Sequence, residues 1–121
     1  MKFTRDHEWI EKCESLYILG ITAFAAKELG ELVFVELPEE NKTYTKGSVL
    51  AVVESTKTSG DVYAPFDLEV VEVNKALRSD PALINRSPYT DGWICKIKCL
   101  DDSQLNELLD ELAYKSLIQS E

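Results

Sequence analysis

The chain has 121 residues and a net charge of −9, from 22 acidic and 13 basic side chains. That length fits one domain over residues 1–121, with room for one hydrophobic core but not for two. Lysine and arginine do not cluster as phosphate neutralisation requires, so nucleic acid is not an expected partner, and no apolar run approaches the roughly 20 residues that span a bilayer.

The N-terminal quarter is predicted to be two strands followed by a helix. Residues 8–13 and 15–21 are β-prone runs separated by a polar turn. Thr22 can cap a helix over residues 23–29 by accepting a backbone N–H with its hydroxyl. Gly30 stands where a glycine commonly follows a helix end.

Lys57 lies between two further β-prone runs, residues 47–55 and 61–74, which follow a shorter run over residues 31–37. The residues between the two runs are small or polar, so the pattern predicts a hairpin that holds a primary amine at its tip. Alternate residues of the first run are expected to face opposite sides of a sheet: Val49, Ala51 and Val53 on one side, Leu50, Val52 and Glu54 on the other. A lysine displayed in this way suits covalent attachment of a long cofactor. The chain is therefore predicted to be a carrier and not an enzyme.

The C-terminal third is predicted to contain a helical turn, a last strand and a helical tail. Pro81 directly after Asp80 favours a short helical turn capped by Asp80. Residues 93–99 are β-prone, and a core-facing row is expected within them: Trp93, Cys95, Ile97 and Cys99. Leucines at helical spacing predict a tail over about residues 102–119, capped by Asp102 or Ser103: Leu105, Leu108, Leu109 and Leu112.

Together these elements predict a mostly β domain with short helices, a flattened β-barrel or sandwich with a core over about residues 16–99. His7 is the only histidine, so no His-based metal cluster is expected. Three cysteines do not make a disulfide framework, and the N-terminus has no targeting segment. We therefore expect a cytoplasmic monomer without a membrane partner, or a mitochondrial protein if a presequence has been removed.

Short stretches in order along nearly the whole chain resemble the H-protein of the glycine cleavage system, a relative of the lipoyl domains. They include DHEW (6–9), GIT (20–22), FVELP (34–38), VESTK (53–57), DVYAP (61–65), EVVEVN (69–74) and DGW (91–93). The resemblance implies the barrel-sandwich hybrid fold of lipoyl domains. It also implies lipoic acid attached to Lys57 through an amide bond.

The resemblance further implies a set of partner enzymes. In the family, glycine decarboxylase (the P-protein) loads the aminomethyl remnant of glycine onto the lipoyl arm. The tetrahydrofolate-dependent aminomethyltransferase (the T-protein) unloads it, and dihydrolipoamide dehydrogenase (the L-protein) reoxidises the dithiol with NAD. A lipoate–protein ligase or an octanoyltransferase would attach the arm.

Five other residues receive roles through the resemblance. Glu54, three positions before the lysine, is implied in recognition by the attaching enzyme, and Asp61 places negative charge on the other side. Glu8 is implied as the acidic partner of the cationic aminomethyl group, because an unpaired buried charge is costly; a structural ion pair is the alternative. Ile21 and Leu29 are implied as apolar lining.

The chain also departs from the family pattern. Thr56 and Gly60 replace a usual valine and serine, and Asp67 and Leu68 replace a Ser-Gly turn. The missing glycine leaves two possibilities, a turn that tolerates leucine or a turn of different shape. Ala23 replaces a frequent aspartate and removes a charge that could help to dock the arm.

Three other functions are compatible with a displayed lysine. The arm could relay lipoyl or octanoyl groups to other lipoyl enzymes, or act as a redox carrier for them. A biotin carrier is disfavoured, because biotinyl lysines usually lie between methionines and here Thr56 and Thr58 flank the lysine. An unmodified binding module that keeps the fold is the last alternative.

Overall fold

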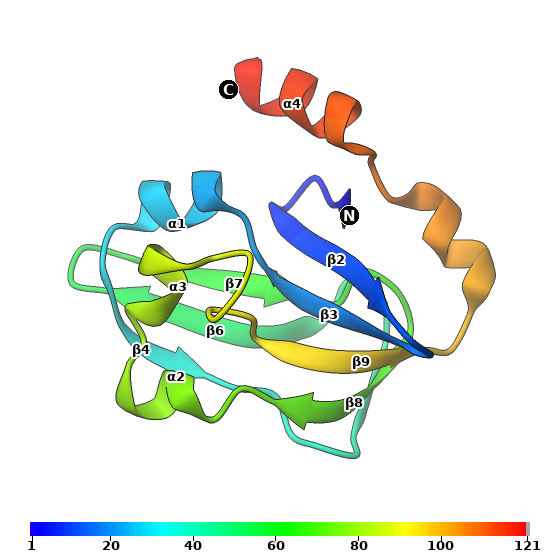
Figure 1. The fold of residues 1–121 in the computed structure, drawn as a ribbon, viewed down its shortest axis with the longest axis horizontal. Helices are drawn as coiled ribbons and strands as arrows, with labels where there is room; N and C mark the ends of the chain where they lie inside the picture. The colour runs from blue at the N-terminus through cyan, green and yellow to red at the C-terminus, as the bar shows by residue number, and fades with distance from the viewer. Residues whose placement is uncertain (121) are drawn as a thin grey trace.

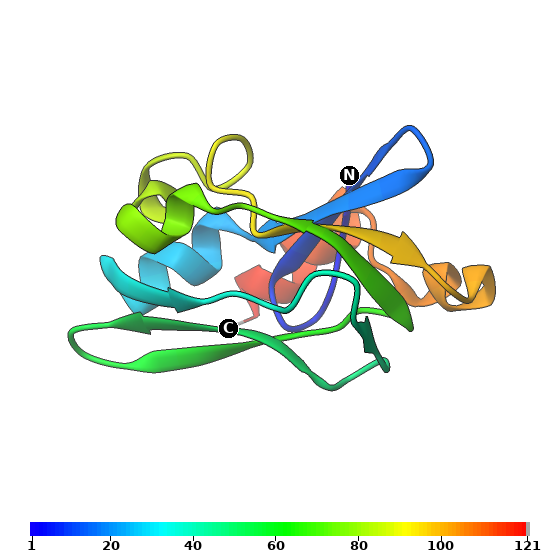
Figure 2. The same cartoon turned by 90° about the horizontal axis from the view of Figure 1, so that it is seen from below.

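Two antiparallel β-sheets face each other in the computed structural model, which describes residues 1–120 (Figures 1 and 2). The six-stranded sheet has the order β1-β2-β3-β9-β8-β5, and the three-stranded sheet has the order β4-β6-β7. The strands are β1 (Lys2–Phe3), β2 (Glu8–Cys13), β3 (Leu16–Ile21), β4 (Leu32–Glu36), β5 (Thr43–Tyr44), β6 (Val49–Ser55), β7 (Ser59–Tyr63), β8 (Leu68–Val73) and β9 (Cys95–Cys99). The helices are α1 (Ala23–Leu29), α2 (Ala76–Ser79), α3 (Leu83–Arg86), the 3-10 helix η1 (Asp102–Glu107) and α4 (Glu111–Gln119).

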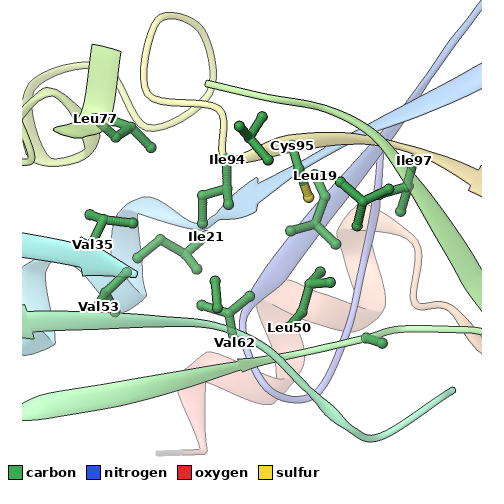
Figure 3. Packing of buried hydrophobic residues seen from close by; sticks show 14 of the residues in the cluster. Leu19, Ile21, Val35, Leu50, Val53, Val62, Leu77, Ile94, Cys95 and Ile97 are labelled. Atoms are coloured by element: carbon green, nitrogen blue, oxygen red, sulfur yellow. The ribbon is translucent and has the colours of Figure 1, made fainter. Parts of the chain in front are cut away.

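The core lies between the two sheets, whose strands direct mainly apolar side chains inward. Figure 3 shows Leu19 and Ile97 of the larger sheet and Val53 and Val62 of the smaller one, all directed into the space between the two sheets. All four are at most 1% exposed. Full burial of such a side chain stabilises the fold by roughly 1.5–3 kcal/mol. The predicted mostly β sandwich with short helices is confirmed.

The N-terminal predictions are also confirmed. β2 and β3 pair antiparallel, with Glu8 opposite Ile21. The Thr22 hydroxyl accepts from Ala25 N (3.3 Å) at the start of α1. Gly30 ends the helix at φ +85°, a conformation that glycine adopts without steric cost. None of the helices in residues 1–120 combines the length and apolar character needed to cross a membrane.

The β-prone run expected over residues 61–74 is divided between the two sheets. β7 belongs to the smaller sheet and β8 to the larger one, so the chain passes from one sheet to the other between them. Phe66 lies in this connection and is fully buried. Leu68 needs no special turn backbone, since the non-glycine residues with positive φ in residues 1–120 are His7, Glu14 and Asn41. The turn thus tolerates leucine, whose side chain packs in the core.

The predicted alternation in β6 is right at its C-terminal end and wrong at its start. Ala51 and Val53 are buried on the inner face, as expected. Val49 is instead 45% exposed and Leu50 is buried. A register shift in the pairing with β7 lies between Val49 and Ala51, and such a bulge reverses the side that the preceding residues face.

Asp80 does not cap the helical turn after Pro81. It ends α2, and its carboxylate forms an ion pair with Arg86, while α3 begins after Ala82 without a side-chain cap. The last strand begins at Cys95 and not at residue 93.

The core-facing row expected in residues 93–99 is confirmed for all members but one. Cys95 and Ile97 are fully buried, and Cys99 packs against the same core. Trp93 instead packs against a separate cluster formed by Phe3, Trp9 and Tyr114.

The helical tail expected over residues 102–119 is confirmed, but it consists of two helices, η1 and α4, and its expected cap is wrong. Asp101, not Asp102 or Ser103, caps η1, and Asp110 caps α4 by accepting from Ala113 N (2.8 Å). Between the two helices, Leu109 is extended because its backbone N–H donates to Phe3 O (2.7 Å) and its carbonyl accepts from Phe3 N (2.8 Å). The leucine row is therefore split: Leu105 and Leu108 pack on the main core, whereas Leu112 is 76% exposed.

Candidate functional site

The hairpin that carries Lys57 is built as the sequence predicts. β6 and β7 pair antiparallel and are joined by residues 56–58. Ser55 fixes the turn: its hydroxyl donates to Thr58 O (3.2 Å) and accepts from the backbone N–H groups of Lys57 (3.3 Å) and Thr58 (3.2 Å). The Lys57 side chain is exposed. The result is an amine displayed from a turn of defined shape.

The Lys57 side chain passes over the end of α1. A Cβ placed on Gly30 would lie 3.1 Å from Lys57 Cε and 3.7 Å from Nζ. Glycine at position 30 therefore suits the positive-φ backbone at the helix end and leaves room for the Lys57 side chain, whose end would otherwise have to shift slightly. The C-terminal end of a helix carries partial negative charge, which favours a nearby ammonium group.

Asn85 of α3 holds this helix end in place. Its Nδ2 donates to Gly30 O (2.9 Å) and Ala26 O (3.3 Å), and its Oδ1 accepts from Leu32 N (2.9 Å). One amide thus joins the last turn of α1 to the first residue of β4. The sequence analysis did not identify Asn85 or Ser55, although Ser hydroxyls that bond to the backbone two or three residues ahead are typical of tight turns.

A cavity of about 340 Å³ opens between α1 and the hairpin, and we call it the α1 cavity. Apolar side chains from β3, α1 and the hairpin form most of its lining: Ile21, Phe24, Ala25, Leu29, Val53 and Val62. Gly60 also lines it, and a Cβ there would lie 3.2 Å from Leu29 Cδ2. The glycine in place of the family's serine therefore leaves this wall without a side chain.

The polar part of the α1 cavity is predominantly acidic. Asp6, Glu28 and Asp61 contribute carboxylates from three separate segments, and His7 is the remaining polar residue. Such a lining favours the binding of a positively charged group.

His7 is placed by contacts with the C-terminal helix. Its backbone has φ +69°. Its Nδ1 hydrogen-bonds the Tyr114 hydroxyl at 2.8 Å, and that hydroxyl also hydrogen-bonds Thr22 Oγ1 at 2.6 Å. Phe24 packs against the imidazole with ring centroids 4.9 Å apart. A buried tyrosine of α4 therefore links the cap of α1 to a residue of the cavity wall.

Glu8 is buried beside the α1 cavity but does not line it. Its side chain is 1% exposed and lies at a second cavity of about 250 Å³. Thr4 Oγ1 donates to Oε1 (2.5 Å), and Tyr63 N donates to Oε2 (3.1 Å). Desolvation by burial raises the pKa of Glu8 from 4.5 to about 7, although these hydrogen bonds favour the ionised form.

The structure therefore brings together only some of the residues singled out from the sequence. Ile21, Leu29 and Asp61 line one cavity next to the lysine. Glu8 pairs with Ile21 across the sheet but faces the other cavity, and within residues 1–120 it accepts hydrogen bonds from Thr4 and Tyr63 and forms no ion pair of the kind considered as an alternative. Glu54 lies on the hairpin opposite Ser59, outside both linings.

The cysteines and acidic side chains in residues 1–120 do not form a metal-binding site. Cys95 is buried in the core, where desolvation raises the pKa of its thiol. In residues 1–120, no group of three or more histidine, cysteine or acidic side chains is arranged to hold a metal ion.

Comparison with known proteins identifies relatives over the whole chain. The family model for the glycine cleavage H-protein matches residues 1–121. The glycine cleavage system H protein of Bartonella tribocorum is 49% identical, covering 96% of this chain and 95% of that protein. The H protein of Sodalis glossinidius is 47% identical, covering 100% of this chain and 93% of that protein.

A solved structure shows the same fold. The crystal structure of a glycine cleavage system H protein from Mycobacterium marinum superposes with a TM-score of 0.85 at 39% identity. The match covers 95% of this chain and 93% of the other.

Proposed function

Because the chain belongs to the glycine cleavage H-protein family, we propose that it carries lipoic acid on Lys57 and passes the aminomethyl group of glycine from the P-protein to the T-protein. The L-protein would then reoxidise the arm. The chain itself would catalyse none of these steps. The observation that carries this proposal is the exposed Lys57 amine on a fixed hairpin beside an apolar cavity with carboxylates.

The residues around Lys57 fit a lipoyl group. When attached, the group supplies a disulfide that accepts the aminomethyl unit. The exposed amine is accessible to a ligase or octanoyltransferase, and the Ser55 hydrogen bonds fix where an arm would begin. Ile21 and Leu29 offer an apolar surface to an alkyl chain and a dithiolane. Glu54 is proposed as a contact for the attaching enzyme.

The carboxylates of the α1 cavity fit a loaded arm better than an empty one. An aminomethyl group carries a cationic amine, which needs an acidic partner when it leaves water. Asp61, Asp6 and Glu28 can face such a group directly. Glu8 lies at the second cavity, so we propose that it does not pair with the amine but fixes Thr4 and Tyr63, which are close in sequence to the lining residues Asp6 and Val62.

Mass spectrometry of protein from its native host tests the attachment. We expect a lipoyl or octanoyl increment on the peptide that contains Lys57. Lys57→Arg should keep the fold, because the side chain is exposed, and should abolish the increment. An unmodified Lys57 in native protein, or a modification on another residue, would contradict the proposal.

Reconstitution tests the metabolic role. Lipoylated protein combined with P-, T- and L-proteins, tetrahydrofolate and NAD should produce NADH only when glycine is added, and the Lys57→Arg variant should produce none. Transfer of the acyl group to other lipoyl domains without glycine-dependent NADH formation would instead support the relay function. Capture of native protein by streptavidin would indicate a biotin carrier.

A further inference from the structure

Two neighbouring apolar side chains on β4 are exposed beside the lysine hairpin. Val33 is 51% exposed and Phe34 is 50% exposed. In a regular strand, consecutive side chains point to opposite faces, so one of the two would be expected in the core. Leu32 and Val35 on either side of the pair are indeed buried, at 2% and 4%.

A β-bulge explains why both side chains are exposed. Leu32 pairs with Ser55 and Phe34 pairs with Glu54, so Val33 is the extra residue of the bulge. Bulges of this kind occur frequently next to functional sites, where they redirect side chains. β4 is also an edge strand of the three-stranded sheet, so no other strand in residues 1–120 pairs with its outer edge.

The exposed pair is within reach of anything that binds the hairpin tip. Phe34 lies opposite Glu54, and Glu54 is three residues before Lys57; because the chain turns after Ser55, the separation of Glu54 and Lys57 is at most roughly 10 Å at about 3.3 Å per residue. A standard protein interface covers about 800 Å² per partner, equivalent to a disc of roughly 16 Å radius. An interface centred on Lys57 would therefore include Phe34.

The chain segment that contains the pair is acidic. Between residues 28 and 40 the chain has five carboxylates and no lysine or arginine: Glu28, Glu31, Glu36, Glu39 and Glu40. Glu31 and Glu36, which flank the pair in sequence, are exposed. A surface of this kind fits a partner with an apolar pocket bordered by basic side chains.

We propose that Val33 and Phe34 form the apolar centre of the docking surface for the enzyme that acylates Lys57. The inference rests on the proposed function, because it needs Lys57 to be the acceptor. That enzyme is the favoured occupant because it must bring a reactive carbonyl to Nζ itself. The reaction forms an amide C–N bond and breaks the bond from the carbonyl carbon to an adenylate or thiol leaving group, which departs with the electron pair while the amine releases a proton.

Steady-state acylation kinetics test the docking surface. The probe is a purified bacterial lipoate–protein ligase supplied with lipoate and ATP, with unmodified wild type, Val33→Thr and Phe34→Ser as acceptors. We expect KM for the acceptor to rise about fivefold for Val33→Thr and tenfold or more for Phe34→Ser, with kcat within twofold. Val49→Thr is the matched control, because Val49 is 45% exposed on the same sheet but near the opposite end of β6. Its KM should stay within twofold of wild type.

The exposed acidic residues that flank the pair, Glu31 and Glu36, allow a second measurement. Raising ionic strength should raise KM for wild type, and Glu31→Gln combined with Glu36→Gln should reduce that dependence. Circular dichroism and thermal unfolding must show that each variant is folded, and Val33→Thr keeps a β-branched residue in the strand for that purpose.

Several results would overturn the proposal. If wild type is acylated on Lys57 and both β4 variants behave like it, the docking surface is wrong while the proposed function stands. If wild type is not acylated at all, both fail. Normal acylation of the variants with loss of glycine-dependent NADH formation would assign the surface to the P-, T- or L-protein. Normal acylation with loss of a wild-type dimer in sedimentation would assign it to a second copy of the chain.

Discussion

Replacing Glu8 by glutamine should remove a pH dependence from the stability of the fold. The side chain is 1% exposed, and in the folded state its burial raises the pKa of Glu8 from 4.5 to about 7. Because the folded state binds this proton more tightly than the unfolded state, the contribution of Glu8 to stability is fully present below pH 4.5. It is lost as the pH rises toward 7 and above, where the carboxylate must be buried in ionised form.

The magnitude follows from the size of the pKa change. One pKa unit corresponds to 1.36 kcal/mol, so a rise from 4.5 to about 7 lowers the free energy of unfolding by about 3 kcal/mol once Glu8 is ionised. Glutamine keeps the shape and can still accept from Tyr63 N, but it does not ionise. The variant should therefore resemble wild type near pH 4.5 and exceed its stability by up to about 3 kcal/mol at pH 8.

Urea denaturation at intervals between pH 4.5 and 8 provides the assay. Other carboxylates also titrate in this range, so the quantity to compare is the difference between wild type and variant at each pH. Glu36→Gln serves as the control, because Glu36 is exposed and should produce a flat difference. Parallel profiles for Glu8→Gln and wild type would refute the reasoning, since they would mean that Glu8 titrates alike in the folded and unfolded states.

Three further variants test the supports of the site. Asn85→Ala should lower the free energy of unfolding by about 2–3 kcal/mol in urea denaturation, because Gly30 O loses its amide partner. Gly30→Ala should cost about 1–3 kcal/mol, because φ +85° with ψ −173° is a backbone conformation essentially restricted to glycine, and it should slow acylation of the lysine whose side chain crosses this position. Tyr114→Phe should cost about 1–2 kcal/mol by removing the hydroxyl bonded to His7 and Thr22, with faster amide exchange in α4.

One control variant serves all three predictions, and a different result would contradict each of them. Ser79→Ala removes only a hydrogen bond on an exposed helix end and should change stability by no more than about 0.5 kcal/mol. An Asn85→Ala protein as stable as this control would show that the α1–β4 junction holds without the amide. Acylation at the wild-type rate in Gly30→Ala would show that the lysine does not need the glycine. Unchanged exchange in α4 of Tyr114→Phe would show that the hydroxyl does not secure the helix.

The sequence alone determined the features that depend on near neighbours in the chain. Thr22 and Gly30 delimit α1 because capping and left-handed backbone act over one helical turn. The hairpin around Lys57 follows from β-prone runs on both sides of small and polar residues. The family resemblance rests on the same local motifs, and the whole-chain match confirms it.

Only the tertiary structure decided the features that combine distant segments. The α1 cavity needs Asp6, α1 and the hairpin together, and Tyr114 reaches its wall from the other end of the chain. The tail breaks at Leu109 because Phe3 pairs with its backbone, which no helical spacing could indicate. The elevated pKa of Glu8 likewise arises from desolvation, which depends on everything packed around the carboxyl group and not on its neighbours in sequence.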